Sequence, residues 1–303
     1  MKKIFSVTDH FVNSRLDRWF RRNVCEVPQS LIEKNIRKGN IKVNNIKMKS
    51  SYKLQNKDQI IIYNIKFSAN KNKKLNKKYI ATKTDLSQSS SMFIENNKNF
   101  VVINKPSGIA VQSGTKSKKN ILDILRSTKE FEGSSPYTVH RIDKETTGVL
   151  IVAKNRKYAQ LFTSLFRIRK IHKTYLAIVL GELEKKRGTF IDELFYYEGK
   201  KTIKTKAVTY FKVLDFNNYY TLLKLNPETG RKHQLRKQLL LHNHPILGDS
   251  KYRILDKNTK KRGILMLHAY KINFSIAGDK YNFSAELPLA FKKILKEKYL
   301  RIF

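Results

Sequence analysis

The sequence predicts an α+β protein in which a small α+β domain precedes a larger domain with a mixed, mainly antiparallel sheet. A helix-helix-strand pattern occupies residues 1–65, and residues 66–91 are rich in lysine and serine with few apolar side chains. From residue 92 onward, alternating apolar runs such as 219–225 occur without the regular strand-helix rhythm of a doubly wound fold. We therefore expect a domain at 1–65, a basic linker at 66–91 and a second domain at 92–303.

The charge of the chain predicts a polyanionic partner. The sequence has 303 residues with 63 Lys and Arg against 24 Asp and Glu, a formal net charge of +39. Nucleic acid is the first candidate for such a partner and an acidic membrane surface the second. No apolar run approaches the roughly 20 residues that a membrane-spanning helix needs, and the N-terminal stretch lacks the apolar segment of a secretory signal.

Cysteine usage indicates a reducing compartment. Cys25 is the only cysteine in the sequence, which excludes an intramolecular disulfide and a multi-cysteine zinc site. A reducing compartment fits the cytoplasm or an organelle of bacterial descent. We also expect a monomer without metal or membrane attachment.

The first domain begins with two predicted helices. In residues 14–22, Leu16, Trp19 and Phe20 share one helical face. The spacing of Ser30 and Glu33 predicts a capping box at the start of the second helix, and Gly39 predicts its end. Short strands are expected at the ranges 41–43 and 60–63, on either side of an Asn44-Asn45 turn.

In the second domain we expect strands at 100–103, 148–153, 173–181 and 219–225, and helices at 156–170 and 290–296. A basic hairpin region carries KKRG at 185–188 and EGKKTIKTK at 198–206. The segment 244–249 is interpreted as mainly a structural turn.

Residues 138–153, TVHRIDKETTGVLIVA, place Asp143 on a polar loop directly before a buried strand. Two interpretations are open from the local pattern. Asp143 is either a turn residue that bonds the backbone or a catalytic carboxylate beside Arg141 and His140.

Three stretches in this order, HRIDKETTG, KTYLAIVLG at 173–181 and TGRKHQLR at 229–236, resemble the RluA family of RNA pseudouridine synthases, as does NKPSG at 104–108. The resemblance implies the pseudouridine synthase fold and isomerisation of uridine to pseudouridine in RNA. That reaction needs no cofactor or metal, and the sequence shows neither a zinc pattern nor a phosphate-binding glycine loop. Within the family, the chain is most similar to the C branch, which implies large-subunit (23S) ribosomal RNA as the partner and a role in rRNA processing.

The resemblance also implies roles for individual residues. Asp143 would be the catalytic carboxylate, Arg236 its buried cationic partner, and Tyr175 the residue that stacks on the base and takes part in proton transfer at C5. Arg141 would fill the space left by the flipped uridine and His140 would brace its loop. His233 and Arg231 would form the pocket wall and a phosphate contact.

The first domain resembles the small RNA-binding domain of ribosomal small-subunit protein four. This implies phosphate contacts from Arg15, Arg18, Arg37, Lys38 and Lys42. The catalytic motifs depart from the family pattern at Ile142 and Thr147, and at Lys237-Gln238, where the family more often has an apolar residue followed by histidine.

Three other functions are compatible with parts of the sequence. The charge and the first domain alone would suit a non-catalytic RNA-binding or ribosome assembly factor. The same chemistry could act on transfer RNA. A metal-dependent RNA hydrolase would use His140, Asp143 and His233, although their spacing is not that of metal ligands.

Overall fold

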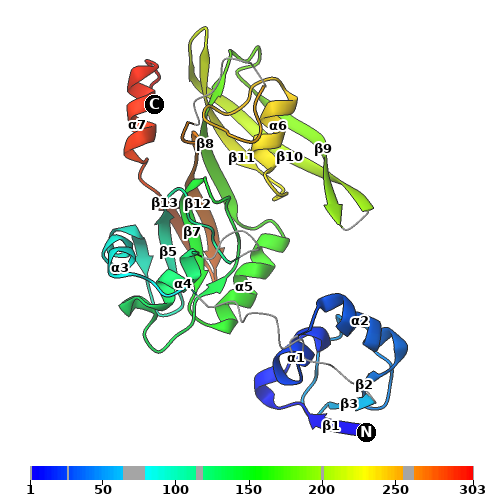
Figure 1. Ribbon diagram of the computed structural model, residues 1–303. Helices are drawn as coiled ribbons and strands as arrows, with labels where there is room; N and C mark the ends of the chain where they lie inside the picture. Colours follow the sequence, from blue (N-terminus) through cyan, green and yellow to red (C-terminus); the bar gives the residue numbers. More distant parts are fainter. Residues whose placement is uncertain are drawn as a thin grey trace. The chain divides into compact units, whose positions relative to one another are not determined.

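The computed structural model describes residues 2–25, 27–63, 79–113, 119–198, 201–254 and 263–302 (Figure 1). The chain divides into two compact units, Met1–Lys77 and Lys78–Phe303. Much of the stretch expected as a linker lies outside the described residues, but its last part is folded. Helix α3 (Lys83–Ser89) begins with a capping box between Thr82 and Asp85.

The first unit combines two helices with a three-stranded antiparallel sheet in the order β1-β3-β2. The strands are β1 (Lys2–Ser6), β2 (Ile41–Val43) and β3 (Gln59–Tyr63), and the helices are α1 (Leu16–Asn23) and α2 (Gln29–Lys38). The expected apolar face of α1 is confirmed, since Leu16, Trp19 and Phe20 are all buried in the core of this unit. Strand β1 was not foreseen.

Helix α2 begins differently from the prediction. Its N-cap is Pro28, without a side-chain hydrogen bond, so the capping box of Ser30 and Glu33 is wrong. Because the helix already starts at Gln29, Ser30 lies inside it and Glu33 accepts a hydrogen bond from the Gln29 side chain instead. The predicted end is confirmed: Gly39 is the C-cap, with a left-handed φ of 79°.

The second unit is built on one large sheet in the order β4-β5-β7-β12-β8-β11-β10-β9. Among the described strands, all neighbours run antiparallel except β7 and β12, so the mixed, mainly antiparallel sheet is confirmed. Its strands are β4 (Phe93–Asn96), β5 (Phe100–Lys105), β7 (Thr147–Ala153), β8 (His172–Leu180), β9 (Arg187–Glu198), β10 (Lys201–Phe216), β11 (Tyr220–Pro227) and β12 (Leu267–Ile276), with β6 (Tyr137–Thr138) against β7 and β13 (Asp279–Ser284) against β12.

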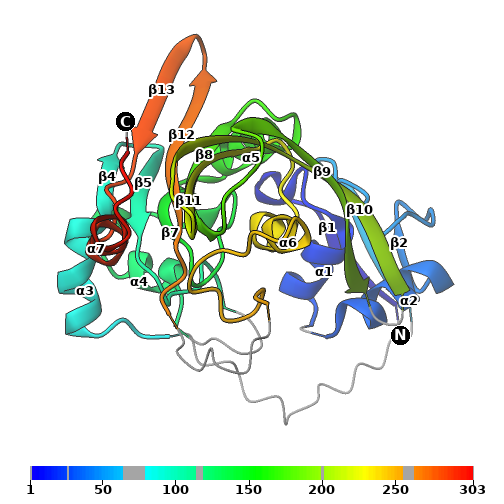
Figure 2. The ribbon, with the colours of Figure 1, turned by 90° about the horizontal axis from the view of Figure 1, so that it is seen from above.

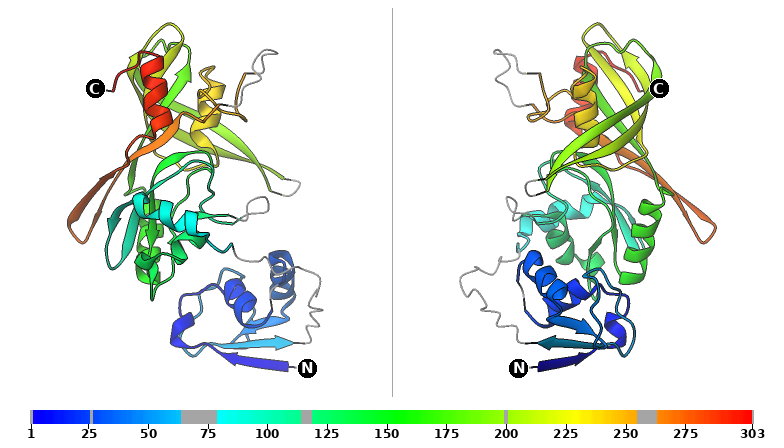
Figure 3. Two further views of the ribbon diagram at one scale, coloured as in Figure 1. Left: turned by 60° about the vertical axis from the view of Figure 1, so that its left-hand side comes forward. Right: turned by 90° about the vertical axis from the view of Figure 1, so that its right-hand side faces the viewer.

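The helices of this unit pack on different parts of the sheet (Figures 1 and 3). Besides α3, they are α4 (Ile121–Arg126), α5 (Arg156–Arg167), α6 (Gln234–Leu241) and α7 (Leu289–Glu297). Seen from above, β8, β11, β10 and β9 arch around α6, which lies on their concave side (Figure 2). The expected strands 100–103, 148–153, 173–181 and 219–225, and the helices 156–170 and 290–296, are confirmed as β5, β7, β8, β11, α5 and α7. No helix in the described part of the chain is long and apolar enough to cross a membrane.

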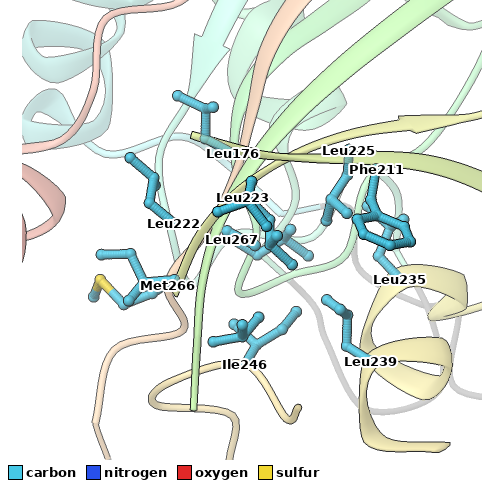
Figure 4. Close-up of a cluster of buried hydrophobic side chains, with 14 of the residues drawn as sticks. Leu176, Phe211, Leu222, Leu223, Leu225, Leu235, Leu239, Ile246, Met266 and Leu267 are labelled. Carbon is cyan, nitrogen blue, oxygen red and sulfur yellow. The ribbon is translucent and has the colours of Figure 1, made fainter. Parts of the chain in front are cut away.

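The core under α6 fixes this helix to the sheet. Leu235 and Leu239 of α6 belong to the same buried cluster as Phe211 of β10 and Leu225 of β11 (Figure 4). Burying such side chains contributes about 1.5–3 kcal/mol each. The helix that carries Arg236 is therefore held at a defined place above the sheet.

The two halves of the sheet meet where β7 and β12 pair in parallel, Thr147 opposite His268 and Gly148 opposite Ala269. Gly148 has a φ of +110°, and a Cβ there would lie 2.2 Å from the carbonyl oxygen of Ala269. Only glycine permits this approach. It explains the glycine that follows the Asp143 loop.

Candidate active site

A cavity of about 530 Å³ opens in the second unit beside α6. Its walls include the seven residues that the sequence nominated for catalysis and base flipping: His140, Arg141, Asp143, Tyr175, Arg231, His233 and Arg236. Asp143 and its neighbours come from the loop before β7, Tyr175 from β8, and Arg236 from α6. Three motifs that are distant in the sequence thus line one cavity.

Arg236 lies near three carboxylates, those of Asp143, Asp249 and Glu145, and the Oε2 of Glu145 is 3.6 Å from the Arg236 Nη1. Its Nη1 is 3.4 Å from Oδ2 of Asp143, so the expected contact is present. Closer bonds go to Asp249, which accepts from Nε at 2.7 Å and from Nη2 at 2.8 Å. The Arg236 side chain is only 3% exposed and Asp249 is fully buried. The guanidinium is thus held by Asp249 and shared with Asp143.

Asp249 is one of the residues that the sequence did not reveal, because 244–249 was interpreted as mainly a structural turn. Burial on its own would raise the pKa of Asp249, but the hydrogen bonds from Arg236 and from the backbone N–H groups of Tyr252 and Lys251 lower it overall. The preceding Gly248 has a left-handed φ of 77°, and a Cβ there would lie 1.9 Å from the carbonyl oxygen of Ile264. The glycine in the sequence indicated a tight turn at this point. It did not indicate that Asp249 in this turn forms an ion pair with Arg236.

The loop that carries Asp143 is braced from below by a buried lysine. Lys105, at the end of β5, is fully buried and its Nζ donates to the carbonyl oxygens of Pro106, Ile109 and Lys144. Burial lowers the pKa of Lys105 to about 7, against the opposing influence of Glu145 and Asp143. The bond to Lys144 fixes the backbone next to Asp143, and the other two tie it to the turn that follows β5.

His233 faces the other side of Asp143. Its Nε2 is 3.8 Å from Oδ1 of Asp143 and its Nδ1 is 2.9 Å from the hydroxyl of Tyr252. Burial lowers the pKa of His233 although Asp143 pulls it upward, so the ring is neutral near pH 7. The contact with Asp143 is therefore polar rather than ionic.

Tyr175 presents its ring to the cavity from β8. Burial, with the nearby charge of Asp143, raises the pKa of its hydroxyl, which therefore stays protonated. Two residues earlier, Lys173 also lines the cavity, and burial lowers its pKa to about 8. The sequence reasoning gave no role to Lys173, although it belongs to the same motif.

His140 and Arg141 are neighbours with different environments. The His140 Nε2 accepts a hydrogen bond from the Ile151 backbone N–H at 2.9 Å, and its ring stacks on Phe166 at 4.6 Å. Burial lowers the pKa of His140 to about 3. A neutral imidazole with this bond braces the loop and does not offer Nε2 to a metal, whereas Arg141 is exposed at the cavity rim.

Gln238 occupies the main departure from the family pattern. It is fully buried on the side of α6 that faces the sheet, where Nε2 donates to Asp192 at 2.7 Å and Oε1 accepts from Thr209 at 2.7 Å. The side chain therefore bonds to β9 and β10. It is absent from the cavity lining in the described part of the chain.

The basic residues nominated in the first unit differ in availability. Arg18, Arg37 and Lys38 are exposed, while the Lys42 ammonium lies 5.4 Å from the ring centre of Tyr63. Arg15 forms a salt bridge with the buried Asp17 at 2.6 Å. Arg15 therefore already has an ionic partner within the protein, unlike an exposed cation that is available to RNA.

Comparison with known proteins identifies the family of the chain. Residues 99–241 match the family model described as RNA pseudouridylate synthase. The chain is 33% identical to the ribosomal large subunit pseudouridine synthase C of Buchnera aphidicola subsp. Schizaphis graminum, over 96% of both chains. It is 32% identical to the enzyme of the same name from Rickettsia felis, over 92% of this chain and 95% of the relative.

Solved structures show the same fold. Human RNA pseudouridylate synthase domain containing 4 matches with a TM-score of 0.61 and 28% identity, over 72% of this chain and 96% of the human chain. Human RNA pseudouridylate synthase domain containing 1 has a TM-score of 0.55 at 22% identity, over 65% and 83% of the two chains, and supports the fold alone. The chain belongs to the RluA family of RNA pseudouridine synthases and is an enzyme of that isomerase class.

Proposed function

We propose that this enzyme converts uridines of large-subunit ribosomal RNA into pseudouridine, with Asp143 as the attacking carboxylate and without a cofactor. The names of the relatives support the substrate. The observation that carries the mechanism is the convergence of Asp143, Tyr175 and Arg236 on one cavity. Ribosome synthesis would place the enzyme in the cytoplasm or in an organelle of bacterial descent.

The reaction breaks the C1′–N1 bond and forms a C1′–C5 bond without net loss of atoms from the RNA chain. Asp143 acts as nucleophile or base beside the sugar while uracil is released, turned and rejoined through C5. The proton on C5 is then lost to solvent, and N1 gains one. The Nη1 of Arg236 lies 3.4 Å from Oδ2 of Asp143 and places a positive charge beside the carboxylate that would attack the sugar.

Tyr175 supports the steps at the base. Its ring offers a flat surface for uracil, and its protonated hydroxyl can relay the C5 proton by accepting one proton while giving up its own. A uridine must leave its stack to reach this cavity. The planar guanidinium of Arg141 at the rim would fill the vacated space, and Arg231 and His233 would hold the flanking phosphate and the pocket wall.

The test measures release of tritium from C5 of labelled uridine in a large-subunit ribosomal RNA transcript, in buffer that contains a chelator. Wild type should release label, and Asp143→Ala should bind the RNA without releasing any. Asp279→Asn is the matched control, because Asp279 is an exposed carboxylate at the start of β13.

Label release by Asp143→Ala would refute the role of Asp143. Loss of wild-type release in the chelator would refute the cofactor-free reaction. Release from transfer RNA but not from the ribosomal transcript would contradict the proposed substrate. Tight RNA binding with no release from either RNA would instead favour an assembly factor.

A further inference from the structure

The face of the sheet opposite α6 carries exposed apolar and basic side chains. Along β9 and β10, buried residues such as Phe190 and Phe211 point towards α6, and every second residue points the other way. The register pairs Ile191 with Val208 and Phe195 with Lys204, so these belong to one surface. We call it the outer face; it consists of Arg187, Thr189, Ile191, Glu193 and Phe195 of β9, Lys204, Lys206, Val208, Tyr210 and Lys212 of β10, and Lys224 and Asn226 of β11.

Large apolar groups are unusually exposed on this face. Ile191 is 61% exposed, Phe195 53% and Tyr210 50%. Single exposed apolar residues are ordinary, but here they occur on adjacent strands of one rigid ladder. Such a surface is suited to a ligand with flat, partly apolar groups.

The outer face carries a net positive charge, which favours an anionic ligand. It carries five basic side chains and a single acidic one, Glu193, which pairs with Lys204. Among the described residues, Lys206, Lys212 and Lys224 show no acidic partner. Cations interleaved with aromatic rings are the composition of surfaces that bind single-stranded nucleic acid; an apolar protein partner would leave these lysines desolvated without compensation.

The outer face is continuous with the rim of the catalytic cavity. The Tyr210 hydroxyl donates to Oε2 of Glu228 at 3.2 Å, and Glu228 lines the cavity. Arg231, another cavity residue, donates from Nε to the carbonyl oxygen of Lys206 at 3.1 Å. A strand that leaves the cavity past Arg231 therefore meets the outer face next.

We propose that the outer face binds the single-stranded RNA that flanks the target uridine, with bases stacked on Tyr210 and Phe195 and phosphates held by Lys206 and Lys212. From Lys204, which lies opposite Phe195, to Tyr210 the strand β10 advances by six residue steps, or about 20 Å. This length accommodates several nucleotides. The inference rests on the proposed action on RNA, and it assigns a function to the basic hairpin region.

The test compares binding of the full-length protein to two RNAs that share the same stem-loop and target uridine. One carries single-stranded flanks of about ten nucleotides on both sides, and the other ends at the stem. Phe195→Ala should weaken binding of the flanked RNA about tenfold, since an aromatic stack contributes about 1–3 kcal/mol. Binding of the short RNA should not change.

The matched control is Tyr219→Ala. Tyr219 is 74% exposed and precedes β11, but it lies outside the outer face. The double variant Lys206→Gln/Lys212→Gln should reduce the slope of log affinity against log salt for the flanked RNA by about 1.4, at about 0.7 for each single-strand phosphate.

Equal affinity of wild type and Phe195→Ala for the flanked RNA would overturn the inference. The inference would also be overturned if Phe195→Ala changed the sedimentation coefficient of the protein but not its RNA affinity. That result would show that a second copy of the chain covers the outer face. Because binding is measured apart from catalysis, failure of the proposed function would appear separately, as absence of tritium release from both RNAs.

Discussion

Arg236 donates two hydrogen bonds to Asp249 and turns its remaining nitrogen, Nη1, towards Asp143 at 3.4 Å. The two-bond contact with Asp249 fixes the plane of the guanidinium, because a planar fork matches a carboxylate in only one orientation. Asp249 is therefore a positioning residue for the cation beside Asp143. The buried positive charge of Arg236 thus interacts with three carboxylates, of which Asp249 is the nearest.

Replacement of Asp249 by alanine should destabilise the protein and abolish activity. Without Asp249, Arg236 is a buried cation with only the partly exposed Asp143 and Glu145 as ionic partners. Breaking a buried pair in this way costs about 3–5 kcal/mol. Urea unfolding at pH 7 measures this, with Asp279→Asn as control; an unchanged midpoint would show that Asp249 does not hold Arg236.

Two substitutions at Tyr175 separate its ring from its hydroxyl. Tyr175→Phe keeps the flat surface and should bind RNA normally, but tritium release should fall at least about 100-fold if the hydroxyl relays the proton. Tyr175→Leu should lose RNA affinity as well. Full activity of Tyr175→Phe would limit Tyr175 to stacking.

Buried histidines should make the protein less stable in acid. His268 is fully buried, and its Nδ1 is 2.8 Å from the hydroxyl of Thr147. Burial lowers its pKa to about 4, although its bond to the Ala285 carbonyl opposes this. Between pH 6.5 and about 4 the unfolded chain binds a proton that the folded chain does not, so stability falls on acidification by up to about 1.4 kcal/mol per pH unit.

The measurement is the unfolding free energy at pH 7.5 and pH 4.5. His268→Asn should be less stable than wild type at pH 7.5, and the difference should shrink at pH 4.5. Ser275→Ala, which replaces a non-titrating side chain at an exposed position on β12, is the control and should leave the pH dependence unchanged. Parallel pH curves for wild type and His268→Asn would contradict the assignment.

A methyl group at Gly148 should disrupt the sheet junction. Gly148→Ala combines an unfavourable φ of +110° with a clash against Ala269, and should cost about 3 kcal/mol or more. Gly278→Ala is the matched control, since Gly278 also has a positive φ, of 93°, but open space where a Cβ would lie. It should cost only about 1–2 kcal/mol. Thermal unfolding distinguishes the two, and equal losses would argue against the clash.

The first unit should add electrostatic affinity without base specificity. Arg18→Gln and Arg37→Gln remove exposed cations and should each reduce the salt slope of RNA binding by about 0.7–0.9. Lys280→Gln, an exposed lysine on β13, should have no effect. Arg15→Gln should instead lower stability, because it leaves the buried Asp17 without its salt bridge. Unchanged salt slopes would exclude Arg18 and Arg37 from phosphate binding.

Local patterns in the sequence predicted most of the elements, because they reflect local physics. The apolar face at Leu16, Trp19 and Phe20 and the left-handed stop at Gly39 follow from helical periodicity and from the freedom of glycine. The predicted N-cap at Ser30 was wrong because Pro28 is also compatible with a helix start. The spacing of Ser30 and Glu33 does not distinguish an N-cap at Ser30 from one at Pro28.

The site was predictable only in part. Motif order nominated Asp143, Tyr175 and Arg236, and the structure brings them to one cavity. Asp249 and Lys105 escaped because an ion pair across a turn and a lysine enclosed by carbonyls depend on tertiary geometry, which leaves no periodic signal. Gln238 is the opposite case, because the sequence marked it as a departure from the family pattern. Its hydrogen bonds to Asp192 of β9 and Thr209 of β10 show that it has a structural role.

The parallel pairing of β7 with β12 bears on when this enzyme becomes active during synthesis. The Thr147 hydroxyl and its partner His268 are separated by 121 positions along the chain. Contacts that close such long loops form late in folding, after local hairpins and helices. During translation, we expect the Asp143 loop to stay without its β12 support until β12 has left the ribosome, so a nascent chain could bind RNA through its first unit well before it could modify a base.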